Sequence, residues 1–179
     1  GPKGIGCLYI RDRHKIKLTP LMHGGGQESR LRPGTSPTHQ IAGMAMAFTL
    51  AKQSMVRDYQ HAKQLRIQLL KLLSSLEGVR LNGDQNHVLP NIINLSFDNV
   101  SVDSLVIALR DDIAIASGSA CNTGAIEASH VLRGMGIEGD RLYGAVRISF
   151  GRYTTEEEIE KAGMRICEEI NRLRQLALE

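Results

Sequence analysis

The sequence has no tryptophan, few cysteines and no long apolar run, and these absences narrow the classes of protein that it can encode. Its three cysteines, at positions 7, 121 and 167, are odd in number and form no CxxC pair. This excludes a disulfide framework and a cysteine-rich zinc site, and it indicates a reducing compartment. The longest uncharged apolar run, residues 41–50, is much shorter than the about 20 residues of a membrane-spanning helix.

Neither sign of charge dominates the chain. Lys and Arg number 22 and Asp and Glu number 19, without a run of like charges. Neither nucleic acid nor a membrane surface is therefore indicated as a partner. Apolar residues make up 42% of the 179, which is enough for a real core. The chain starts at Gly1-Pro2 and its first methionine is Met22, so we interpret it as a piece of a longer protein.

Apolar periodicity and turn residues predict a mixture of strands and helices. Strands are expected over residues 4–10, 16–18, 79–81, 91–97, 113–116 and 146–150. Helices are expected over residues 37–76 (one helix or two), 101–110, 127–134 and from 155 onward, where a capping box begins. The last of these helices has an expected apolar stripe of Ile159, Met164, Ile166, Ile170 and Leu173. This order favours an α+β fold in which helices cover one face of a mostly antiparallel sheet.

The three cysteines differ in their surroundings. Cys7 lies in the first expected strand and Cys167 in the last helix, so both are interpreted as small apolar core residues. Cys121 lies in the small-residue segment SGSACNTG, residues 117–124, without apolar neighbours. A thiol on such a loop is accessible, and accessibility together with thiolate formation is what a sulfur nucleophile needs. Composition alone leaves a mobile nucleophile and an incidental surface thiol equally open.

Three other features can bear chemistry, and each also has an ordinary structural interpretation. The glycines at 24–26 and the hydroxyl of Thr35 precede a helix start and suit a phosphate, although a flexible loop explains the glycines as well. Arg147 lies on the polar side of its strand, where it is either solvated or a clamp for a carboxylate. The six histidines have no metal-binding spacing, and no GxxxxGKS/T loop is present.

Five segments together resemble one family. They are residues 1–6 (GPKGIG), 23–35 (HGGGQESRLRPGT), 117–121 (SGSAC), 129–134 (SHVLRG) and 147–158 (RISFGRYTTEEE). In this order they are similar to the C-terminal part of the pyridoxal-phosphate-dependent cysteine desulfurases, which have the class V aminotransferase fold. Many relatives have SGSACTS and RGMRSGT where this chain has SGSACNTG and SRLRPGT. These departures do not change Thr35, Cys121 or Arg147, but they do not indicate which sulfur-transfer pathway the protein serves.

The resemblance implies an enzyme that takes sulfur from L-cysteine and leaves L-alanine. Cys121 is then the nucleophile that becomes a persulfide and passes its sulfur to an acceptor or iron–sulfur scaffold protein. Arg147 binds the substrate carboxylate, and Thr35 contacts the phosphate of pyridoxal 5'-phosphate in the neighbouring subunit, which implies a homodimer. No metal site is expected beyond a transient contact of an iron–sulfur cluster with Cys121.

The same resemblance places the lysine that holds the cofactor a few residues before the GPKG segment. Lys3 is then a structural lysine, and this chain alone is expected neither to hold the cofactor covalently nor to turn over. The expected organisation is the end of a large cofactor-binding domain (1–36), a connecting helix (37–60) and a small domain with the cysteine loop (61–179).

Iron–sulfur cluster assembly in the bacterial cytoplasm, or in an organelle of bacterial origin, is the leading expectation for the pathway. Desulfurases that serve tRNA thiolation, nitrogenase maturation or DNA phosphorothioation are alternatives. A class V relative without desulfurase activity, for which Cys121 would be dispensable, is another. A non-enzymatic dimerisation or acceptor-docking module also remains open.

Overall fold

The structure is a computed structural model that describes residues 1–117 and 129–177. The chain divides into two compact units, Gly1–Met55 and Val56–Glu179, and each is described by itself. The helix α1 (Thr38–Leu73) is one continuous helix and contributes residues to both units. Its start lies one residue after the start expected at position 37, and the carbonyl of Pro37 accepts the first helical hydrogen bond, from the N–H of Ile41 (3.0 Å).

The unit Gly1–Met55 consists of irregular chain, the short 3-10 helix η1 (Gln27–Arg30) and the first part of α1. None of its apolar side chains is buried. Polar contacts tie its segments together instead: Gln40 donates to the carbonyl of Lys3 (2.9 Å), and Arg13 donates to the hydroxyl of Ser29 (2.6 Å).

The expected strands at residues 4–10 and 16–18 are wrong, and so is the buried position expected for Cys7. Both segments are irregular, and the Cys7 side chain is exposed. A strand exists only where a second strand accepts and donates its backbone hydrogen bonds. Residues 1–55 contain no strand that could do so, and an apolar run cannot reveal that from sequence.

The unit Val56–Glu179 contains an antiparallel sheet with strand order β1-β2-β4-β3 among the described residues. The strands are β1 (Val79–Leu81), β2 (Ile92–Phe97), β3 (Ala116–Ser117) and β4 (Ala145–Ser149). The expected sheet is therefore confirmed, although β3 is shorter than the strand expected at 113–116. Strand β4 lies between its neighbours and pairs with β2 over five residues, from Ile92 opposite Ser149 to Ser96 opposite Ala145.

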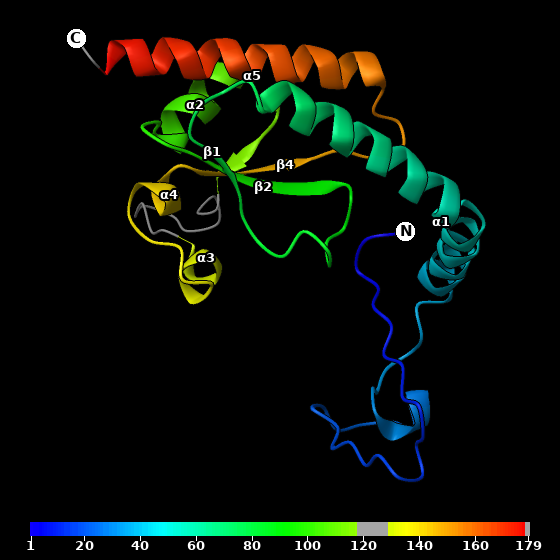
Figure 1. The fold of residues 1–179 in the computed structure, drawn as a ribbon. Coiled ribbons are helices and arrows are strands. Elements are labelled where there is room, and N and C mark those ends of the chain that lie inside the picture. Colours follow the sequence, from blue (N-terminus) through cyan, green and yellow to red (C-terminus); the bar gives the residue numbers. More distant parts are fainter. Residues whose placement is uncertain (118–128, 178–179) are drawn as a thin grey trace. The chain divides into compact units, whose positions relative to one another are not determined.

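Helices cover one face of this sheet, as expected. Figure 1 shows the C-terminal part of α1 and the helix α5 (Glu156–Leu176) over that face, together with α2 (Val102–Leu109). The main core fills the space between these layers and includes Leu65, Leu69, Ile93, Leu95, Phe97, Leu105, Val146, Ile148, Ile166 and Ile170. The short helices α3 (His130–Gly134) and α4 (Asp140–Tyr143) form a second small core with Ala145 at the start of β4.

Local signals explain the helix starts well. The capping box at Thr155 is present with both of its hydrogen bonds, and Ser101 and Ser129 cap α2 and α3. The stripe expected on α5 is wrong at Met164, which is about half exposed. Gly163, and not Met164, lies on the buried face of α5, where it packs closely against Leu72 of α1. Helix α4 was not expected from the sequence.

None of the helices in the described ranges combines the length and the apolar character that a membrane crossing requires.

Gly144 and Gly151 flank β4 and give a matched test of this packing. A Cβ at position 144 would lie 2.5 Å from the carbonyl oxygen of Phe97 and 3.1 Å from that of Asp140, whereas nothing lies within 4 Å of a Cβ at position 151. Gly144→Ala is expected to lower the free energy of unfolding by about 1–3 kcal/mol, because backbone atoms have to move. Gly151→Ala is expected to change it by less than about 0.5 kcal/mol. Denaturant unfolding of both variants measures this, and equal effects would contradict the close contact.

Candidate functional site

Arg147 lies at the centre of β4, and the alternation of side chains along the strand places it on the face of the sheet away from the main core. Its neighbours in the strand, Val146 and Ile148, point to the opposite face and are buried in the main core. The Arg147 side chain is exposed and makes no hydrogen bond or ion pair that involves another residue in the described ranges. The two-sided alternation expected for this strand is thus confirmed, and it leaves a guanidinium available to an anion.

The residues that flank Arg147 across the sheet are neutral. Asn94 of β2 is its direct partner on one side, and Ala116 of β3 is its direct partner on the other. By contrast, Arg80 of β1 forms an ion pair with Asp98 (3.1 Å). Arg147 therefore lies in a cross-strand row that offers it no carboxylate.

A hydrogen-bond network of four side chains and two backbone carbonyls includes Asn94 of this row. Arg141 of α4 donates through Nε to Oδ1 of Asn82 (3.0 Å) and through Nη2 to the carbonyl of Leu81 (3.1 Å). Asn82 in turn donates through Nδ2 to Oδ1 of Asn94 (2.7 Å) and to the hydroxyl of Ser96 (2.8 Å). The Ser96 hydroxyl donates to the carbonyl of Arg141 (2.6 Å), which closes the network. Asn82 and Ser96 are buried, and no pattern in the sequence indicates this network.

Cys121, the expected nucleophile, lies outside the described residues. The chain before it is β3, whose Ser117 pairs with Val146 and whose Ala116 pairs with Arg147. The described chain continues at Ser129, which caps α3. The segment that carries Cys121 therefore begins one residue after the cross-strand row of Arg147.

The two described cysteines differ in exposure. Cys7 is exposed, contrary to expectation, whereas Cys167 on α5 is half-buried, with its Sγ 3.9 Å from the carbonyl oxygen of Leu72. Burial raises the pKa of the Cys167 thiol above its ordinary value, so less of it is thiolate near neutral pH. This agrees with a structural role for Cys167.

Thr35, the expected phosphate contact, belongs to the unit Gly1–Met55. Its side chain is exposed three residues before α1 begins, and Gly34 before it has a φ of 96°. Arg32 braces this turn by donating through Nη1 to the carbonyl oxygens of Pro33 and Gly34 (3.1 and 3.4 Å). Residues 1–55 contain eight Lys or Arg and two Asp or Glu, so the unit favours an anion.

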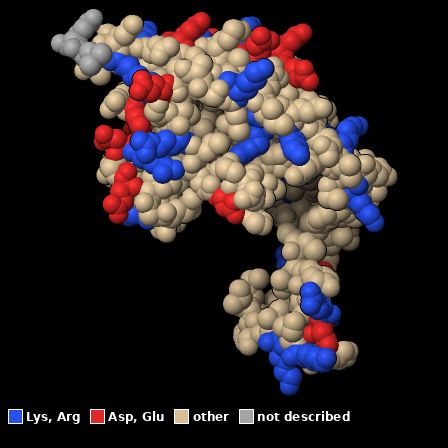
Figure 2. Space-filling model, viewed as in Figure 1, with Lys and Arg blue, Asp and Glu red and all other residues tan. Residues whose placement is uncertain are grey.

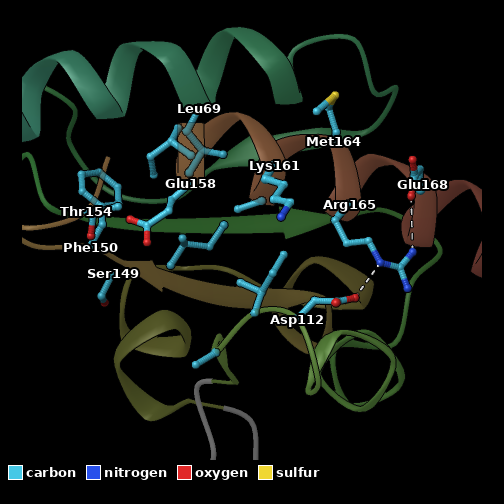
Figure 3. Close-up of a pocket in the computed structure, with 15 residues that line it drawn as sticks. Leu69, Asp112, Ser149, Phe150, Thr154, Glu158, Lys161, Met164, Arg165 and Glu168 are labelled. Atoms are coloured by element: carbon cyan, nitrogen blue, oxygen red, sulfur yellow. Dashed lines mark hydrogen bonds and ion pairs between the residues drawn. The ribbon is translucent and has the colours of Figure 1, made fainter. Parts of the chain in front are cut away.

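A hollow of about 660 Å³ lies between α5 and the chain that leads into β3 (Figure 3). Its walls include Ile148 and Phe150, which belong to the helix-covered face of the sheet, opposite Arg147. Arg165 in this wall is bound to Asp112 (2.9 Å) and Glu169 (2.8 Å), and the hydrogen bond that it donates to Asp112 is the main reason that the pKa of Arg165 is raised. Among the described residues, its lining contains neither cysteine nor histidine, and the hollow lies on the face of the sheet opposite the Arg147 side chain.

Metal ligands and charged patches do not suggest another site. No group of three or more His, Cys, Asp or Glu in residues 1–117 and 129–177 is arranged to hold a metal ion. In the view of Figure 2, acidic and basic side chains are interspersed over the unit formed by Val56–Glu179. The row of Arg147 is therefore the strongest candidate site in the described part of the chain.

Comparisons with known proteins show which family the chain resembles. Residues 1–162 match the family described as aminotransferase class-V. The chain is 45% identical over 177 residues to cysteine desulfurase IscS of Pseudomonas putida (strain W619) and 48% identical to that of Vibrio atlanticus (strain LGP32). Each match covers 99% of this chain and 44% of the relative. A solved structure named NifS-like protein has a TM-score of 0.81 and 34% identity, over 96% of this chain and 43% of that chain.

The exposure of Cys7 and the burial of Cys167 predict different alkylation rates. Cys7 is expected to react with iodoacetamide about tenfold faster or more at pH 7.5, because it is exposed and needs no local opening. The labelling rate of Cys167 is expected to keep rising to higher pH than that of a free cysteine, since burial raises its pKa. Peptide mass spectrometry across a pH series measures both rates. Equal rates for the two thiols would contradict this placement.

Proposed function

The chain belongs to the class V aminotransferase family, and from this premise we propose that it forms the C-terminal part of a cysteine desulfurase. Such an enzyme takes sulfur from L-cysteine and leaves L-alanine. Because the chain spans 44% of the length of the curated relatives it matches, the activity is proposed for the whole protein that contains it. The observation that carries the proposal is the guanidinium of Arg147, which has no partner among the described residues and lies beside the strand that leads into the SGSAC segment.

Arg147 is proposed to bind the carboxylate of L-cysteine. Its planar fork presents donors that match the two oxygens of a carboxylate, and the neutral row around it leaves these donors available. Since β4 is the strand next to β3, a substrate held by Arg147 lies near the start of the segment that carries Cys121. The Cα of Cys121 is four residues from that of Ser117, and so within roughly 14 Å of it by chain length alone.

Cys121 is proposed to accept the sulfur. Its thiolate attacks the thiol sulfur of the substrate, an S–S bond forms and the substrate C–S bond breaks. The electron pair of the broken bond stays with the carbon fragment, which takes a proton and leaves as L-alanine. The terminal sulfur of the Cys121 persulfide is then transferred to an acceptor protein. The proposed setting of this transfer is iron–sulfur cluster assembly, in a bacterial cytoplasm or in an organelle of bacterial origin.

Pyridoxal 5'-phosphate is the cofactor that the family implies, and the residues around Thr35 fit its phosphate. An exposed hydroxyl before the N-terminus of a long helix, in a basic unit, is a suitable donor set for a phosphate group. We infer that Thr35 binds the phosphate of the neighbouring subunit in a homodimer. When bound, the cofactor supplies an electron sink for the carbon fragment.

The 179-residue chain alone is proposed neither to hold the cofactor covalently nor to turn over, because the attaching lysine is expected outside it. After incubation with pyridoxal phosphate and reduction with borohydride, peptide mapping is expected to find no lysine that carries one equivalent of cofactor. Stoichiometric labelling of one lysine, such as Lys3, would contradict this part of the proposal.

Cys121→Ala in the whole protein tests the proposed function. Sulfide and persulfide delivery are expected to fall to background, because no other thiol in this chain occupies the SGSAC segment, while binding of pyridoxal phosphate stays unchanged. Cys7→Ala is the matched control, since Cys7 is an exposed thiol in the unit Gly1–Met55, outside the SGSAC segment, and it is expected to retain full delivery. Retained delivery in Cys121→Ala would refute the role of this residue.

A further inference from the structure

We propose that Asn94 binds the substrate carboxylate together with Arg147, through the N–H groups of its side-chain amide. This rests on the role proposed above for Arg147 and adds a second, neutral donor to the same site. Three properties of the chain lead to it: the strand register, the direction of one hydrogen-bond network and the absence of acidic side chains from the row.

The register places Asn94 and Arg147 side by side. They are direct partners in the antiparallel pair of β2 and β4, and Cβ atoms of such partners lie about 4.5–5.5 Å apart. Both lie on the face that α1 and α5 leave uncovered, because Ile93 and Leu95 beside Asn94 are buried in the main core. A carboxylate bound to the Arg147 guanidinium is thus within reach of the Asn94 amide.

The network around Asn82 allows the Asn94 amide only one orientation. Arg141 has donors and no acceptor, so the Asn82 atom that faces its Nε at 3.0 Å has to be the oxygen. The nitrogen of Asn82 then faces Asn94 at 2.7 Å, so Asn94 has to present its own oxygen there. Consequently the NH₂ group of Asn94 points away from Asn82, and none of its hydrogen bonds goes to a residue in the described ranges.

Burial makes this orientation costly to change. Asn82 is 7% exposed and Ser96 is 0% exposed, and Ser96 both accepts from Asn82 and donates to the carbonyl of Arg141. Turning the Asn82 amide would place its NH₂ against the guanidinium and leave buried donors without acceptors. Arg141 and Asn82 are therefore positioning residues, and they fix the direction in which Asn94 offers its donors.

The chemistry of this pair suits a carboxylate better than other ligands. A carboxylate only accepts hydrogen bonds, and the pair offers it only donors: the charged fork of Arg147 and the neutral amide of Asn94. Ala116 on the other side of the row is small and leaves space for the ligand. A cation or a hydrogen-bond donor would find no partner in these two groups.

Steady-state kinetics of L-alanine formation by the whole protein test the proposal. Asn94→Ala is expected to raise the KM for L-cysteine about tenfold, the effect of losing one hydrogen bond to a charged group, with kcat nearly unchanged. Asn94→Asp has the same shape and keeps an acceptor for Asn82. It is expected to raise KM further, because its carboxylate occupies the Arg147 fork. Asn91→Ala is the matched control, since this asparagine precedes β2 outside the network and is expected to leave KM unchanged.

Titration of the whole protein with L-alanine provides a readout without turnover. The side-chain NH₂ resonances of Asn94 and the Nε–H resonance of Arg147 are both expected to shift, whereas ethylamine, which lacks the carboxylate, shifts neither.

A shift at Arg147 alone, or a KM within twofold of wild type in both Asn94 variants, overturns the role of Asn94 and leaves that of Arg147 intact. No shift at either residue contradicts both roles. Absence of L-alanine production by the unaltered whole protein would instead refute the proposed function.

Discussion

The pairing of β4 with β2 is the constraint on which the rest of the unit Val56–Glu179 depends. Side chains alternate along β4, so Val146 and Ile148 enter the core while Arg147 remains on the open face. A slip of one residue would bury the guanidinium under α5 and expose the core residues. The same register therefore determines both the stability of the unit and the position of its candidate site.

Two features beyond the strand itself hold this register. The N–H of Phe97 donates to the carbonyl of Gly144 (3.2 Å), which extends the pairing by one bond at a point where no Cβ would fit. Arg141, just before β4, reaches back to β1 and Asn82, and its carbonyl accepts from Ser96 of β2. Moving β4 along β2 would break these contacts together. The network that orients Asn94 thus also fixes where β4 begins.

Most of the fold of this unit could be predicted from sequence because its signals are local. The capping box at Thr155, the alternation around Arg147 and the order of strands and helices are properties of short segments. The failures at residues 4–10 and at Met164 have the opposite character, since they depend on a partner strand and on the line of contact between two helices. The network of Asn82 was invisible for the same reason, because it joins residues up to 60 positions apart. Cys121 was identified by composition and resemblance, and its position stays a prediction.

The choice of neutral residues around Arg147 has a physical consequence for binding. Arg80 and Arg165 are paired with carboxylates, so their charge is compensated within the chain. Arg147 has Asn94 and Ala116 beside it, and an amide can donate to a bound anion without competing with it for the guanidinium. A carboxylate at position 94 would compensate the charge of Arg147 and weaken its attraction for any ligand. Asn82 and Arg141 orient the neutral amide of Asn94, so this amide can donate to a bound anion in one fixed direction. Because the amide carries no charge, the positive charge of Arg147 is preserved.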